Sequence, residues 1–249
     1  MSSIALQRIV LSAWLLATAL VCQAAAQTPG ADELVTTAIA HHDPLETWST
    51  GSFRLELEES RPDGSVRKTT VGIDNKASRF ELESEREGRR VSGRVSSEEC
   101  AWQLDGKTDF SDDEREEFQL TCERLKRTRD YYTFLWGMPM KLQDPGTLIG
   151  DEVKTVDFQG QESWEVRVTY AEDVGSDIWY FYISPENRAL VGYRFYHDEA
   201  ANDGEYITLE GLQEGAGLRL PRQRAWYMHQ DDEFLGTDTL ISISPWRSE

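Results

Sequence analysis

The sequence predicts a mainly β protein with a few helices, and two observations carry this prediction. Apolar side chains alternate with polar ones over about ten or eleven short segments, which is the period of a strand with one buried face. Turn residues such as Gly, Pro, Asn and Asp separate these segments, roughly every 8–12 residues. Short, evenly spaced strands favour an antiparallel sandwich or barrel over alternating strands and helices.

The first two strands form a clear hairpin. Phe53, Leu55 and Leu57 alternate with polar neighbours, and residues 61–64 (Arg-Pro-Asp-Gly) supply a turn in which Pro fixes φ and Gly tolerates positive φ. Residues 66–73 return as the second strand. The other predicted strands occupy residues 79–85, 90–96, 100–104, 164–170, 178–184, 189–197, 205–210, 222–229 and 234–244.

Three segments have helical character instead. Residues 32–41 place Leu34, Val35, Ala38 and Ile39 on one face at helical spacing. Residues 111–117 begin with a Ser that can cap a helix and continue with acids that suit its first turn. Residues 123–136 form a third helix with an apolar stripe of Leu125, Tyr132 and Trp136. This stripe is either ordinary core packing or the wall of a ligand cavity.

The first 26 residues are typical of a cleaved export signal. Residues 1–8 carry one positive charge, residues 9–21 are apolar, and residues 24–26 (Ala-Ala-Ala) offer a cleavage site. A retained membrane anchor is one alternative, but the apolar run is shorter than the ~20 residues that a spanning helix needs. Acylation of Cys22 is the other alternative, but the signal for acylation has a small residue just before the cysteine, and Val21 is not small. Residues 27–249 are therefore predicted to be one soluble periplasmic or secreted domain.

The acidic charge of the chain restricts its partners. The formal net charge is -19, and cleavage after Ala26 removes Arg8 and no acid, so the mature charge is -20. Such a chain repels nucleic-acid phosphates and anionic lipid surfaces, so we expect no nucleic-acid partner. The sequence does not identify a protein partner, and a structural or interaction domain of the cell envelope, with a stable protein partner, is a third possible role. Hydrophobic residues make up 39% of the chain and aromatic residues 10% of the chain. These fractions are typical of a globular domain.

Two cysteines remain in the mature chain, Cys100 and Cys122. In an oxidising compartment an even pair favours a disulfide, and two reduced buried thiols are the alternative. Nothing near either residue indicates an activating base, so a catalytic thiol is not expected.

Several segments resemble an uncharacterised family of exported bacterial proteins, a domain of unknown function. They span nearly the whole mature chain and bring no known activity with them. The segments are His42-Asp43-Pro44, Thr121-Cys122-Glu123-Arg124, Asp130-Tyr131-Tyr132, GMPMKLQDPGT (residues 137–147), Trp179-Tyr180-Phe181-Tyr182, His197-Asp198-Glu199, NDGEYI (202–207), RAWY (224–227) and Leu235-Gly236-Thr237-Asp238.

The order of elements is also similar to the periplasmic lipoprotein-carrier and lipoprotein-sorting architecture. The similarity covers the first helix, the strand GSFRLELEES (51–60), the turn LDGKT (104–108) and the late strand GLRLPRQRAWY (217–227). It implies an antiparallel sheet curled into a half-barrel, with helices on its concave side and an apolar cavity for acyl chains. The likeness is one of layout, and a shared fold alone does not establish a function.

Aromatic residues are dense at 179–182, 193–196 and 226–227. If both faces of these strands carry rings, one face holds more than a core needs, and a surplus apolar face on a curled sheet can build a ligand cavity. A sheet covered on both faces is the alternative. We expect non-catalytic binding of an apolar or amphipathic, lipid-like molecule, with polar contacts at the mouth of the cavity. The expected ligand-binding residues are His42, Tyr131, Tyr132, Trp136, His197, Arg224 and Trp226.

A periplasmic hydrolase is the alternative function. His42 beside Asp43, and His197 beside Asp198, can act as acids, bases or metal ligands if they converge in space; otherwise they are ordinary loop residues. No H-E-x-x-H motif occurs, and the acidic runs at 112–114 and 231–233 lack the spacing of a calcium loop. The S-x-x-K pattern at 65–68 follows a turn rather than opening a helix. No metal or cofactor is expected.

Overall fold

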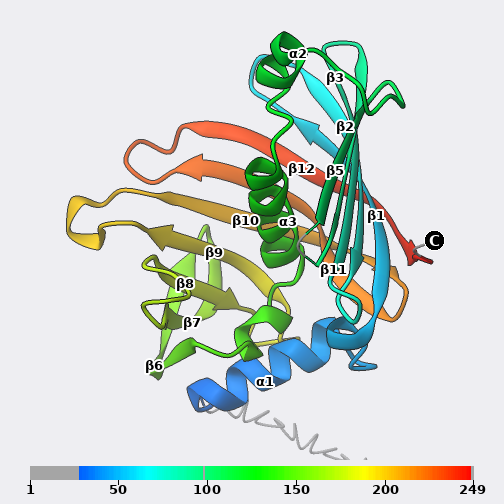
Figure 1. The fold of residues 1–249 in the computed structure, drawn as a ribbon. Coiled ribbons are helices and arrows are strands. Elements are labelled where there is room, and N and C mark those ends of the chain that lie inside the picture. Colours follow the sequence, from blue (N-terminus) through cyan, green and yellow to red (C-terminus); the bar gives the residue numbers. More distant parts are fainter. Residues whose placement is uncertain (1–27, 98, 248–249) are drawn as a thin grey trace, which may run out of the picture.

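The computed structural model describes residues 28–97 and 99–247, and twelve strands of these ranges form one antiparallel sheet (Figure 1). Their order across the sheet is β5-β4-β3-β2-β1-β12-β11-β10-β9-β8-β7-β6. The strands are β1 Ser52–Ser60, β2 Val66–Asp74, β3 Arg79–Arg86, β4 Arg89–Ser96, β5 Glu99–Leu104, β6 Thr147–Phe158, β7 Gln161–Tyr170, β8 Ile178–Ile183, β9 Leu190–Tyr196, β10 Glu205–Gly215, β11 Leu218–Met228 and β12 Phe234–Pro245.

The sheet is curled but not closed, and helices lie on its concave side (Figure 1). The helices are α1 Ala31–His42, α2 Asp112–Glu117 and α3 Cys122–Trp136. The chain leaves the sheet at one edge, β5, and passes through α2 and α3 before it enters the other edge at β6. This arrangement confirms the predicted half-barrel with helices on its concave side.

The predicted strand number was too low by about one, because β6 was not recognised. β6 is an edge strand, most of its side chains are exposed or half-buried, and its register shifts between Ile149 and Val153. An edge strand with a bulge does not show the regular alternation from which the other strands were predicted.

The helix α3 packs closely on the first half of the sheet. Its residues Leu125 and Trp136 are 0% and 2% exposed, and they join the core with the inward side chains of β1. Gly93 in β4 makes this approach possible, because a Cβ atom there would come within 2.7 Å of the Leu125 side chain and 2.9 Å of Trp102. The apolar stripe of α3 is therefore part of the core over these residues.

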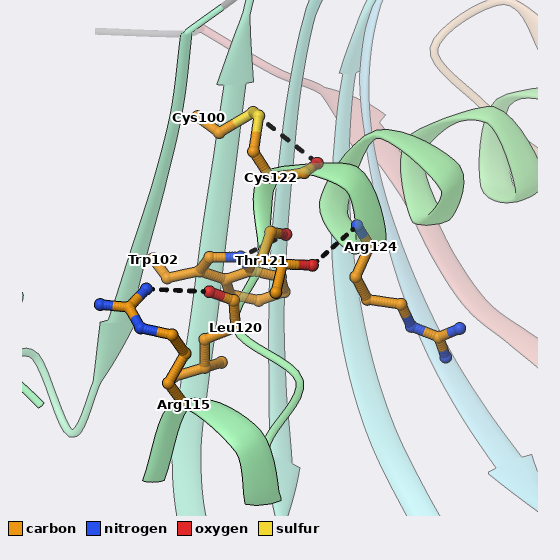
Figure 2. The surroundings of a disulfide bond; sticks show 7 residues. All are labelled: Cys100, Trp102, Arg115, Leu120, Thr121, Cys122 and Arg124. Carbon is orange, nitrogen blue, oxygen red and sulfur yellow. Dashed lines mark hydrogen bonds between the residues drawn. A yellow bond between two sulfur atoms is a disulfide. The ribbon is translucent and has the colours of Figure 1, made fainter. Parts of the chain in front are cut away.

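A disulfide fixes the start of α3 to the edge of the sheet (Figure 2). Cys100 in β5 is bonded to Cys122, with 5.4 Å between their Cα atoms. Beside this bond the Trp102 indole Nε1 donates to the Thr121 carbonyl over 3.0 Å, and the Thr121 hydroxyl accepts from the Arg124 amide over 3.2 Å. The expected disulfide is thus present, and it pins the N-terminal end of α3.

The predicted export signal, its cleavage site and Cys22 lie outside the described residues. Within the two described ranges, every helix is too short or too polar to cross a bilayer.

Candidate ligand site

His42 ends α1 and is fully buried, and both of its ring nitrogens are used inside the protein. Its Nε2 lies 2.9 Å from the backbone nitrogen of Leu190, and its Nδ1 lies 2.5 Å from the carbonyl oxygen of Arg219. Because Leu190 donates to Nε2, the proton of the neutral ring is on Nδ1 and donates to Arg219. Burial lowers the pKa of His42 to about 4, so the ring is neutral at pH 7. His42 connects α1 to β9 and β11 rather than facing a ligand.

The Asp43 carboxylate is also hydrogen-bonded to residues close to it in the sequence. Its carboxylate accepts from the backbone amides of Thr47 and Trp48, each over 2.8 Å, and from the Thr47 hydroxyl over 3.0 Å. These three hydrogen bonds fix the turn that follows α1.

His197 lies just beyond the other end of β9, where its Nδ1 is 2.8 Å from an oxygen of Asp177. This hydrogen bond raises the pKa of His197. Asp198 accepts from the Ala200 amide over 3.0 Å and so caps a short 3-10 turn. His42 contacts the first residue of β9 and His197 follows the last, which separates them by roughly 20 Å along an extended strand. The structure does not bring the two His-Asp pairs together, and no group of three His, Cys, Asp or Glu able to hold a metal occurs among the described residues.

Five of the expected ligand-binding residues do lie together, between α3 and β11. The Tyr131 ring stacks on Trp226 at 6.4 Å and meets Tyr132 edge-on at 5.3 Å. The Trp136 ring lies 3.5 Å from the guanidinium carbon of Arg224. Tyr131 is 46% exposed, yet desolvation by the surrounding protein raises its pKa. The Tyr131 side chain therefore packs against protein on most sides and is open to solvent on one side.

Aromatic side chains continue from this point across the concave face. Phe134 of α3 meets Trp179 at 5.1 Å, and Trp179 stacks on Phe195 at 4.8 Å. We call the whole set the aromatic strip, which consists of Tyr131, Phe134, Tyr170, Trp179, Phe195 and Trp226. Trp179 and Trp226 are buried, whereas Phe134, Tyr170 and Phe195 are half-buried. His197 touches the far end of the aromatic strip, with its ring 5.5 Å from Phe195.

Both faces of the sheet carry rings, but they differ in exposure. On the outer face Phe158 stacks on Tyr182 at 3.9 Å and Tyr206 stacks on Tyr227 at 4.9 Å. Phe158, Tyr182 and Tyr206 are at most 5% exposed. On the concave face α1 and α3 take up much of the space, so the aromatic strip is a half-covered surface rather than an open cavity.

A row of charged residues crosses the concave face beneath α3. Arg67 in β2, Glu59 in β1, Asp238 in β12 and Arg224 in β11 are successive cross-strand partners, and we call them the charge row. Glu59, Asp238 and Arg224 are 4%, 6% and 1% exposed. Buried charges are costly unless hydrogen bonds satisfy them, so the pairing within this row matters for stability and for binding.

Glu59 is fully satisfied. Arg67 donates to its two oxygens over 2.8 and 2.9 Å, the Thr69 hydroxyl donates over 2.5 Å, and the Tyr132 hydroxyl donates over 2.9 Å. Burial alone would raise the pKa of Glu59, but the hydrogen bonds and the charge of Arg67 outweigh it, and the pKa lies below its ordinary value.

Arg224 and Asp238 are far less satisfied. Among the described residues Arg224 makes one well-formed hydrogen bond, from Nη2 to the Leu135 carbonyl over 3.1 Å. Its Nε and Nη1 make none, and neither does the buried Tyr193 hydroxyl that lies beside the guanidinium. The Trp226 indole donates to Oδ2 of Asp238 over 2.8 Å. Within the part of the chain that the structure describes, Oδ1 accepts no hydrogen bond and has Arg61, 3.8 Å away, as its ion-pair partner. Burial, and then the charge of Glu59, raise the pKa of Asp238.

Of these four residues, Arg224 was predicted from the sequence as a ligand contact, whereas Glu59, Asp238 and Arg67 were not. A signal for two of them is visible in the sequence: Glu59 continues the inward phase of Leu57, and Asp238 is in phase with Leu240. A charged residue at an inward position of an alternating strand indicates a buried polar site.

The fold is an antiparallel half-barrel with helices on its concave side, and solved structures with a similar fold exist. A LolA superfamily protein from Nitrosomonas europaea has the same fold, with a TM-score of 0.52, 9% identity and coverage of 89% of this chain and 96% of that chain. A putative outer membrane lipoprotein-sorting protein domain from Vibrio parahaemolyticus aligns with a TM-score of 0.49 and 11% identity, over 87% of this chain and 92% of that one. At 9% identity the likeness to the Nitrosomonas europaea protein concerns the fold alone.

The chain belongs to a family of unknown function, DUF6503, whose model matches residues 12–242. This membership confirms the resemblance that the sequence segments indicated. No curated protein matches the sequence.

Proposed function

We propose that this protein binds an apolar or amphipathic, lipid-like ligand at the aromatic strip and does not catalyse a reaction. The observation that carries the proposal is the exposure of the aromatic strip: its outermost ring, Tyr131, is 46% exposed, and three further rings are half-buried. An exposed apolar cluster rimmed by polar groups is typical of a binding surface, because covering it removes apolar area from water. Tyr and Trp suit such a site, since each ring also carries a polar group that orients a ligand.

The neutral fluorophore N-phenyl-1-naphthylamine tests this proposal. We expect it to bind the mature protein, and we expect Tyr131→Ala to weaken binding about tenfold, which corresponds to the loss of roughly 1.4 kcal/mol of apolar contact. Phe234→Ala is the matched control, because Phe234 is 38% exposed and packs on Tyr227, outside the aromatic strip. Failure of the wild type to bind the fluorophore, or equal weakening by both substitutions, would contradict the proposal.

We also propose that residues 1–26 direct export and that residues 27–249 act as a single periplasmic or secreted domain. The disulfide between Cys100 and Cys122 supports this, since such bonds persist mainly in oxidising compartments. Protein expressed with its full sequence and recovered from the periplasm is expected to begin at Gln27. Its intact mass should lie two hydrogens below that of the reduced chain. A mass that retains residues 1–26, or that includes a lipid on Cys22, would rule out this processing.

A further inference from the structure

The charge row contains two acid–arginine pairs of the same kind, and only one of them is closed. Arg67 and Glu59 face each other across adjacent strands and form two hydrogen bonds. Arg224 and Asp238 also face each other across adjacent strands, but no hydrogen bond joins them. Asp is one methylene shorter than Glu, and Arg224 is instead directed at the Leu135 carbonyl and the Trp136 ring.

The open pair presents unused donors beside an unused acceptor. Nε and Nη1 of Arg224 are donors, and Oδ1 of Asp238 is an acceptor. Both residues are more than nine-tenths buried. A buried polar atom without a hydrogen bond lowers the stability of the folded protein. The Tyr193 hydroxyl lies beside Arg224 and is also without a hydrogen bond, so among the described residues it can serve one Arg224 donor but not the acceptor Oδ1 of Asp238 together with the remaining donor.

The open pair lies directly under the exposed end of the aromatic strip. Trp226 connects the two, because its indole donates to Asp238 while its ring stacks with Tyr131. Tyr131 and Arg61, which border the pair on the solvent side, are 46% exposed and 44% exposed at the side chain. Exposed side chains change rotamer rapidly, so a small group can reach the pair when these two move.

We propose, building on the proposed function, that the open pair Arg224–Asp238 selects amphipathic ligands whose polar group is uncharged and carries an acceptor next to a donor, as a carboxamide does. The ligand carbonyl accepts from Arg224, its N–H donates to Asp238, and its apolar chain lies on the aromatic strip. A carboxylate that pairs with Arg224 is repelled by Asp238, and an ammonium that pairs with Asp238 is repelled by Arg224, so neither ion matches both members of the pair. An ester supplies the acceptor but leaves Oδ1 of Asp238 without a donor.

Four ligands with the same alkyl chain test the proposal on the unmodified protein. Decanamide, methyl decanoate, decanoate and decylammonium are each used to displace N-phenyl-1-naphthylamine at pH 7. We expect decanamide to bind about tenfold more tightly than methyl decanoate, the effect of one additional buried hydrogen bond, and more tightly than either ion. The proposal would be overturned if the ester or either ion bound as tightly as decanamide or more tightly. It would also be overturned if none of the four ligands displaced the fluorophore. Absence of fluorophore binding would instead reject the proposed function itself.

The substitution Asp238→Glu supplies the matched variant. The added methylene brings the carboxylate within reach of Arg224, as in the pair of Glu59 with Arg67, and so closes the pair. We expect the variant to lose the tenfold preference for decanamide over methyl decanoate, a ratio of two displacement constants that does not depend on how tightly the fluorophore itself binds. A preference that persists in the variant would show that the open pair does not select the polar group.

Discussion

Replacing His42 with phenylalanine is expected to lower the free energy of unfolding by about 4 kcal/mol at pH 7. The substitution keeps a ring of similar size but removes the hydrogen bonds to the Leu190 amide and the Arg219 carbonyl. Each buried group left without a partner costs about 1–3 kcal/mol. Urea unfolding followed by tryptophan fluorescence measures the change.

The neighbouring His41 provides the control for this prediction. His41 is only half-buried and makes neither of the two connections to β9 and β11. We expect His41→Phe to change stability by less than about 1 kcal/mol. Equal losses in the two variants would mean that the hydrogen bonds of His42 do not hold α1 to the sheet.

The pH dependence of stability gives a second measurement on His42. Its pKa is about 4 in the folded protein, below the ordinary value near 6.5, so between these values the unfolded chain binds a proton that the folded chain does not. The contribution of the neutral ring is therefore present above pH 6.5 and is lost as the pH falls towards 4. This pKa shift corresponds to about 3 kcal/mol of stability. The free energy of unfolding of the wild type minus that of His42→Phe should therefore fall by this amount between pH 7 and pH 4. A difference that is flat from pH 7 to pH 4 would contradict it.

The substitution Glu59→Gln is expected to cost about 3 kcal/mol of stability. It leaves the Arg67 guanidinium without its counter-charge and places an amide N–H₂ where Arg67, Thr69 and Tyr132 all donate. Breaking a buried ion pair costs roughly 3–5 kcal/mol, and the lower end applies because the Arg67 side chain is 38% exposed and partly screened by water.

Glu58→Gln is the control for Glu59, because Glu58 is the adjacent residue of β1 and points to the outer face. We expect it to change stability by less than about 0.5 kcal/mol in the same urea titration. The pKa of Glu59 is lowered in the folded protein, so its contribution is present above the ordinary carboxyl pKa and is lost as the pH falls through the folded value. A Glu59→Gln variant as stable as wild type at pH 7 would show that α3 does not depend on this pair.

Most of the fold could be predicted because alternation of apolar and polar residues reports directly on one buried face. Phe53, Leu55 and Leu57 illustrate this, as all three are at most 2% exposed. β6 escaped prediction because an edge strand buries little and therefore carries little alternation. The disulfide followed from the count of cysteines and the expected compartment rather than from any local pattern.

The candidate site was predictable only in part. Trp226 was named because of the aromatic density around it, Trp136 because of the apolar stripe of its helix, and Tyr131 as a polar contact. Tyr131 stacks with Trp226, and Trp136 lies against Arg224. His42 was identified by its chemistry, but a sequence does not reveal that both ring nitrogens meet backbone groups from strands more than 140 residues away. The charge row depends on cross-strand register, which brings Glu59 and Asp238 together from opposite ends of the chain.

The seam between β1 and β12 has a consequence for how the molecule is made. It joins the first and last strands of the sheet, with partners such as Ser60 and Thr237 that are 177 residues apart. A chain that is synthesised from its N-terminus therefore cannot join the two halves of the sheet until β12 has also been made. Contacts of such long range form slowly, because the intervening loop must be closed first. Until then the inward faces of both halves stay uncovered along this seam, and the half-barrel is completed only when the last strand is available.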